Sequence, residues 1–186
     1  AGFLDLIADQ TTFFARRCFL KFATLPIGKP DGRLHVVSRD LARAQPAIAV
    51  ETMQNLLENW EAYAPSLQSQ YDALNSGVGA AFDPTTALAP LPRAWQWLDG
   101  SAYDSHGDLM QKVFKMDPIP KDRPLMYQGM SHEFLPATAD VLFPSKEDGI
   151  DFEGEFGIIC DAVPMGANAR TAMNHIRLLV QINDWS

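Results

Sequence analysis

The stretch Ile150-Asp-Phe-Glu-Gly-Glu-Phe-Gly-Ile-Ile-Cys160 places two acidic residues, Glu153 and Glu155, at alternate positions of a short apolar run. Side chains two residues apart in a β-strand point to the same face, so a strand here projects both carboxylates side by side. The same alternation predicts that the apolar side chains between them enter the core: Phe152, Phe156 and Ile158. Two neighbouring carboxylates repel each other unless a proton or a divalent cation lies between them. The stretch therefore predicts a β-strand with a metal site, and a strand whose second face is simply wet fits the spacing equally well.

Composition and net charge indicate a globular protein and limit the kinds of partner that it can bind. The chain has 186 residues, of which 47% are hydrophobic, enough for one domain or two small ones on the usual scale of roughly 100 to 200 residues per domain. A net charge of -8 and a pI near 4.8 argue against a nucleic-acid partner or an anionic membrane surface. No apolar run approaches the roughly 18 residues of a membrane span. An anionic substrate would need a metal to offset this negative field.

The cysteines and the first residues bear on compartment. Cys18 and Cys160 are too few for a disulfide framework and lack metal-ligand spacing, which fits a reducing cytoplasm. Asp5 and Asp9 interrupt the first apolar stretch, so we expect no targeting signal there. The chain stops directly after an apolar run at residues 178–182, which leads us to expect a fragment of a longer protein.

The first half of the chain predicts a hairpin followed by helices. Strand-like runs at residues 20–25 and 34–38 flank a Gly- and Pro-containing turn at residues 28–32. Apolar residues then recur at helical spacing from Val50 to Leu74, and Pro65 predicts a split into two helices at that point. A coiled coil is the alternative, but the stripe is short and broken, which favours packing against the hairpin. Residues 77–92 read as a loop.

Asp99 and His106 are the polar pair most suited to chemistry in the next segment. A helix predicted over residues 103–115, capped by Ser101 or Asp104, would place His106 near its start. Such a histidine suits proton transfer, although a surface histidine near a helix terminus is the more common explanation for an isolated pair.

The remaining elements are short. Strands are predicted at residues 124–129, 141–144 and 178–182, with a helix at residues 167–176 that Asn168 can cap. The order of strand, helix and strand predicts a mixed sheet. Asp184 follows the last apolar run, where a third carboxylate can complete a metal site.

Five segments, in this order, resemble the fumarylacetoacetate hydrolase family, and most closely its bacterial members with a compact N-terminal domain: residues 32–40 (GRLHVVSRD), 91–103 (LPRAWQWLDGSAY), 124–129 (PLMYQG), 149–155 (GIDFEGE) and 183–184 (ND). The resemblance runs from about Lys21 to the last residue, and residues 1–19 are an extension of unclear status. It implies an α+β fold in which a small N-terminal α/β domain, residues 20–90, holds the hairpin and two helices. Residues 91–186 would be the first part of a mixed β-roll catalytic domain. Family members continue with a second stretch that supplies a lysine near the metal, so we expect this chain alone to be inactive.

The resemblance also assigns roles. The family holds Mg2+ or Ca2+, with Mn2+ a further option, by an E-x-E pair and a later aspartate, which match Glu153, Glu155 and Asp184. The closest members add, as a further metal ligand, an aspartate seven residues before the catalytic histidine, which matches Asp99 and His106. His106 would act as general base while the metal binds two oxygens of a β-diketone or 2-oxo acid and polarises the carbonyl.

The implied reaction is hydrolysis of a carbon-carbon bond, as in the conversion of fumarylacetoacetate to fumarate and acetoacetate in tyrosine catabolism, by a cytoplasmic homodimer. Hydration, decarboxylation or tautomerisation of a 2-oxo acid on the same scaffold is one alternative, because fold and metal do not fix the chemistry. A non-catalytic, cation-binding fragment is the other.

Overall fold

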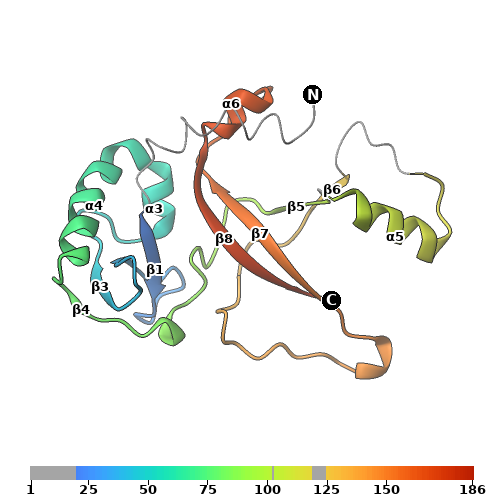
Figure 1. The fold of residues 1–186 in the computed structure, drawn as a ribbon, viewed down its shortest axis with the longest axis horizontal. Coiled ribbons are helices and arrows are strands. Elements are labelled where there is room, and N and C mark those ends of the chain that lie inside the picture. Colours follow the sequence, from blue (N-terminus) through green and yellow to red (C-terminus); the bar gives the residue numbers. More distant parts are fainter. Residues whose placement is uncertain (1–19, 102, 119–124) are drawn as a thin grey trace.

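The computed structural model describes residues 20–101, 103–118 and 125–186, and its helices and strands form the α+β arrangement expected from the sequence (Figure 1). The N-terminal extension, with Cys18, lies outside the described residues. Two 3-10 turns, η1 (Pro84–Thr86) and η2 (Lys146–Asp148), accompany the helices and strands. No described helix is both long and apolar enough to cross a membrane.

The first part of the chain forms a four-stranded antiparallel sheet in the order β1-β2-β3-β4. The predicted hairpin is confirmed by β1 (Lys21–Leu25) and β2 (Arg33–Val37), whose register pairs Thr24 with Leu34. The sequence analysis missed β3 (Arg43–Pro46) and the short β4 (Ala80–Ala81), which lies inside the segment interpreted as a loop. β3 has no large apolar side chain and β4 has only two residues, so neither strand gives a clear period-two pattern.

Two helices cover this sheet, but Pro65 does not separate them. They are α3 (Met53–Glu58) and α4 (Trp60–Asn75), and the break falls at Asn59, whose φ of -137° is not helical. Pro65 lies inside α4 on its exposed side, where water can satisfy the carbonyl that loses its amide donor. The prediction of two helices is therefore confirmed and the predicted position of the break is wrong.

A buried apolar cluster joins the sheet to the helices. Its fully buried members come from β2, α3 and α4 and include Leu34, Val36, Met53, Leu56, Leu67 and Leu74. Thr52 caps α3 by accepting a hydrogen bond from the Asn55 amide. We call β1 to β4 with α3 and α4 the N-terminal unit.

The next two strands form a separate hairpin with a helix beside it. β5 (Leu98–Ser101) pairs antiparallel with β6 (Leu125–Gln128), and α5 (Asp104–Phe114) follows β5. The predicted helix is confirmed, but its N-cap is Tyr103, which makes no side-chain cap, and the prediction of Ser101 or Asp104 is wrong. Asp104 instead lies in the first turn, where a negative charge complements the helix dipole.

A second hairpin crosses the middle of the molecule in Figure 1 and is made by β7 (Phe152–Cys160) and β8 (Ile176–Trp185). The short helix α6 (Ala169–Met173) precedes β8, and Asn168 caps it as predicted by accepting from the Thr171 amide. Residues 141–144 form no strand. Every strand pair in the described ranges is antiparallel, so the mixed sheet predicted from the order of elements is not found there.

The faces of β7 are the reverse of the prediction. Phe156 is 84% exposed, and Phe152 and Ile158 are also exposed, whereas Glu153 and Glu155 lie on the half-buried face. Alternation does place the two sets on opposite faces, as expected. Which face is covered depends on the neighbouring elements, and the β5–β6 hairpin and α5 approach the acidic one.

The β1–β2 turn gives a prediction about stability. Gly28 and Gly32 both have positive φ, 73° and 56°, so alanine at either position is strained by on the order of 1 kcal/mol. A Cβ at Gly32 would also lie 2.7 Å from the Leu25 carbonyl oxygen, whereas nothing lies within 4 Å at Gly28. In denaturant unfolding, Gly32→Ala should therefore lower the free energy of unfolding clearly more than Gly28→Ala. Equal losses would show that the turn relaxes at no cost.

Candidate metal centre

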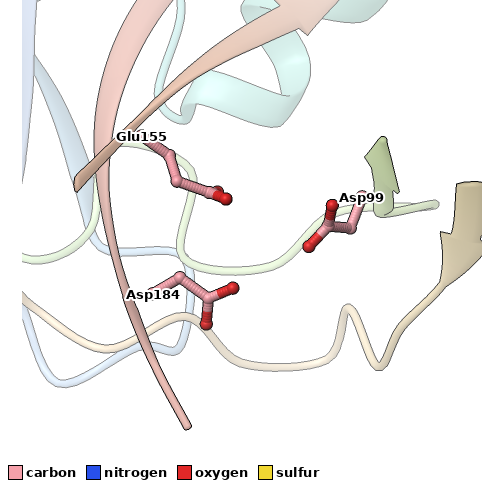
Figure 2. Close-up of side chains that lie close together, drawn as sticks. All are labelled: Asp99, Glu155 and Asp184. Atoms are coloured by element: carbon pink, nitrogen blue, oxygen red, sulfur yellow. The ribbon is translucent and has the colours of Figure 1, made fainter. Parts of the chain in front are cut away.

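Three carboxylates from three strands meet on one side of the β7–β8 hairpin. Asp99 comes from β5, Glu155 from β7 and Asp184 from β8, and one oxygen of each lies within 4.8 Å of the others (Figure 2). In the part of the chain that the structure describes, this is the one group of three or more potential ligands with such spacing. All three residues are half-buried. The arrangement can therefore present several oxygen atoms to one cation.

The strand register explains how Asp184 reaches this place. Glu153 pairs with Asp184 and Glu155 with Ile182, so both glutamates and Asp184 project from the same face of the hairpin. Glu155 and Asp184 are diagonal neighbours across the ladder, a spacing that long side chains can bridge. The period-two pattern of β7 predicted that the two glutamates share a face. The register with β8 supplied the third carboxylate.

Electrostatics in the cluster favour an added positive charge. Burial raises the pKa of Glu155 above its usual value, and the negative charges of Asp99, Asp184 and Glu153 raise it further. His106 acts in the opposite direction. A divalent cation between the carboxylates would remove this repulsion, and three oxygen donors are the ligand type that Mg2+ and Ca2+ prefer. The donor set therefore fits a hard divalent cation.

Glu153 stands apart from the three-carboxylate cluster and faces His106 instead. His106 lies in the first turns of α5, and its Nδ1 is 4.0 Å from the Glu153 Oε2. Both side chains are partly exposed to solvent. The structure thus brings all five candidate residues to one region, with Asp99 joining the cluster and Glu153 beside the histidine. Their roles as ligands and base stay predictions.

Tyr127 is a site residue that the sequence reasoning missed. The β5–β6 register pairs it with Asp99, and its hydroxyl donates to the Asp99 Oδ2 over 2.8 Å. This hydrogen bond, with burial and the nearby negative charges, raises the pKa of Tyr127 to about 12. The residue lies in one of the segments that carry the family resemblance, but only the strand pairing reveals its partner.

Close packing behind Tyr127 fixes the direction of its ring. The Trp97 and Tyr127 rings meet edge to face with centroids 5.8 Å apart. Trp97 lies so close to the backbone of Gly129 that a Cβ there would come within 1.8 Å of the indole. Gly129 is therefore required for the position of Trp97, and through it for that of Tyr127 and Asp99.

Comparison with protein families covers most of the chain. The model of the fumarylacetoacetase N-terminal domain 2 matches residues 20–93, and the model of the fumarylacetoacetate (FAA) hydrolase C-terminal domain matches residues 96–186. No curated protein sequence matches the chain. The second match contains all five candidate residues and Tyr127.

The raised pKa of Tyr127 gives a prediction about pH. Below about pH 10 the hydroxyl keeps its proton in both folded and unfolded chains, so the stabilisation from its bond to Asp99 is complete; it is lost as pH rises toward about 12. In an absorbance titration, the parent should show a phenolate forming near pH 12 that is absent from Tyr127→Phe. The variant Asp99→Asn should return that titration toward pH 10, because the carboxylate acceptor is gone. A Tyr127 that ionises near pH 10 in the parent would contradict the hydrogen bond.

Proposed function

Because the chain belongs to the fumarylacetoacetate hydrolase family, we propose that its acidic site serves the hydrolysis of a carbon-carbon bond of a β-diketone or 2-oxo acid with the help of a divalent cation. The family is one of enzymes, many of which bind divalent metals. The observation that carries the proposal is the meeting of Asp99, Glu155 and Asp184 within 4.8 Å. Such a cluster is unfavourable as three bare charges and favourable around a cation.

Asp99, Glu155 and Asp184 are the residues that would hold Mg2+ or Ca2+, with Mn2+ as a further occupant. When bound, the cation would polarise the carbonyl that is attacked and offset the charge of the departing enolate. Tyr127 supports this set, because its hydroxyl donates a hydrogen bond to the Asp99 Oδ2 and so fixes the direction of that carboxylate. Partners of this kind orient the groups that bind a metal.

His106 is the proposed general base. It would take a proton from the water whose oxygen forms the new bond to the carbonyl carbon. The carbon-carbon bond then breaks, its electron pair goes to the enolate, and that carbon finally takes up a proton. Glu153, whose Oε2 is 4.0 Å from the His106 Nδ1, would stabilise the positive charge that forms on His106. Such contacts are often longer without substrate than with it.

The family resemblance supports a finer proposal for the substrate. We propose fumarylacetoacetate or a related acylpyruvate, in the catabolism of tyrosine or other aromatic compounds, with the protein acting as a homodimer in the cytoplasm.

Titration of cations tests the carboxylate cluster. The parent should bind Mn2+, Mg2+ and Ca2+ in isothermal titration. Glu155→Gln and Asp184→Asn should weaken binding by more than the roughly 10- to 100-fold that loss of an outer partner costs, because each removes a charged donor. Tyr127→Phe should fall within that range. Glu147→Gln, an exposed carboxylate in η2, is the matched control and should bind as the parent does.

The variant Glu153→Gln tests whether Glu153 lies outside the cation site or binds the cation directly. Its side chain lies outside the cluster, so we expect it to weaken cation binding less than Glu155→Gln does. Equal effects would show that Glu153 binds the cation directly. Absence of binding by the parent would refute the proposed cation site.

Oxalate tests the class of substrate, because it carries the two adjacent oxygens of a 2-oxo acid. We expect oxalate to bind in the presence of Mn2+ and not in its absence. His106→Gln should keep this binding, since the histidine acts on water, but should slow any acylpyruvate hydrolysis by about 100- to 10,000-fold. Oxalate binding that is equally strong with and without Mn2+ would contradict the proposed chelation.

A further inference from the structure

The carboxylates of the cluster come from two hairpins that are not part of one sheet. Asp99 belongs to β5–β6, whereas Glu155 and Asp184 belong to β7–β8, and in the described residues no backbone ladder joins the two hairpins. Figure 2 shows Asp99 approaching the other two carboxylates from a separate strand. Some other part of the molecule must therefore fix the separation across the cluster.

The segment that leads into β5 is bound to the N-terminal unit. Arg93 donates two hydrogen bonds to Asp31 in the β1–β2 turn, from Nε to Oδ1 over 2.8 Å and from Nη2 to Oδ2 over 2.5 Å. The Trp95 indole donates to Glu58 at the end of α3 over 2.9 Å. Leu91 packs against the buried core of the unit. Asp99 follows these anchors by only a few residues.

A second set of contacts binds β8 to the same unit. The guanidinium of Arg177 lies 5.7 Å from the ring centroid of Trp60, and its Nη2 is 3.0 Å from the Glu61 Oε1. The Arg177 side chain is only 15% exposed. Its Nε also donates to Asp161 over 2.7 Å, and the same carboxylate is 2.6 Å from His175. The contact is thus held from both sides.

Apolar contacts also join these segments to the N-terminal unit. Ile159 of β7 and Leu178 of β8 pack against the buried core of the N-terminal unit, as Leu91 does. The β7–β8 hairpin and the segment that leads into β5 therefore both contact the N-terminal unit, whereas the β5–β6 hairpin itself lies away from it (Figure 1). Asp184 lies seven residues beyond Arg177, about 23 Å along an extended strand. A tilt of β8 by a few degrees at Arg177 therefore moves the Asp184 carboxylate by about 1 Å.

We propose that the N-terminal unit is the frame that sets the cation site, with Arg93 and Arg177 as positioning residues that fix Asp99 relative to Glu155 and Asp184. The inference rests on the proposed cation site and extends it to selectivity. Mg2+ demands near-ideal octahedral geometry with short bonds, whereas Ca2+ accepts a wider range of distances and ligand numbers. A frame that is loosened should therefore lose Mg2+ before it loses Ca2+.

The experiment compares Mg2+ and Ca2+ titrations of the parent with those of Arg93→Met and Arg177→Met. We expect Mg2+ affinity to fall by about threefold for the exposed Arg93 and about tenfold for the more buried Arg177, with a clearly smaller change for Ca2+. Arg33→Met is the matched control, because Arg33 pairs with Glu51 inside the N-terminal unit and touches neither hairpin through that pair. Its affinities for both cations should stay unchanged.

Two further variants separate positioning from general loss of stability. Asp31→Asn removes the partner of Arg93 from an exposed turn, so it should reproduce the effect of Arg93→Met, and the double variant should add nothing to it. These variants carry the test if Arg177→Met does not fold. Thermal melting of each variant is measured alongside the titrations.

The outcomes distinguish the two proposals. If the parent binds cations and the Arg93, Asp31 and Arg177 variants bind Mg2+ as tightly as the parent, the frame is refuted and the cation site stands. The frame is also refuted if the affinities for Mg2+ and Ca2+ fall equally and in proportion to the drop in melting temperature, in Arg33→Met as well as in the other variants. A parent that binds neither cation removes the proposed site, and the frame with it.

Discussion

Repulsion among Asp99, Glu155 and Asp184 is the constraint on which the functional part of the structure depends. Their oxygens lie within 4.8 Å of one another, and burial together with the neighbouring charges raises the pKa of Glu155. Partial burial strengthens this repulsion because less water screens it. The protein holds the carboxylates together by backbone ladders and packing, and a divalent cation is the natural partner for that arrangement.

The acidic residues of this region have different neighbours. Tyr127 holds Asp99 from behind, and the packing of Trp97 on Gly129 fixes the ring that does so. Glu153 faces His106, outside the three-carboxylate cluster. One face of a single strand, β7, therefore places Glu155 in the three-carboxylate cluster and Glu153 beside His106. The opposite face is aromatic and exposed, so the two faces differ completely in chemistry.

The N-terminal unit joins the parts that carry these groups. Arg93 joins the segment before β5 to this unit by hydrogen bonds to Asp31, and Arg177 joins β8 to it by an ion pair with Glu61. Individual exposed ion pairs contribute little to stability. Here these contacts fix the positions of β5 and β8, because two strands that share no ladder must still bring their carboxylates to one point. The stability of the unit itself comes from its buried core, to which Leu34 and Leu56 belong.

The sequence by itself determined the local features: the β1–β2 hairpin, two helices after it, α5, the Asn168 cap, and the placement of Glu153 and Glu155 on one face of β7. These depend on turn residues and on periods of two or 3.6, which neighbouring residues fix. Tertiary structure decided the rest. Pro65 was tolerated inside α4 because its side of the helix is exposed, and Phe156 was left exposed because other elements approach the acidic face. The partnership of Tyr127 with Asp99, and the grouping of Asp99 with Glu155 and Asp184 rather than with Glu153, arise from strand register and from contacts between distant segments, which no local pattern encodes.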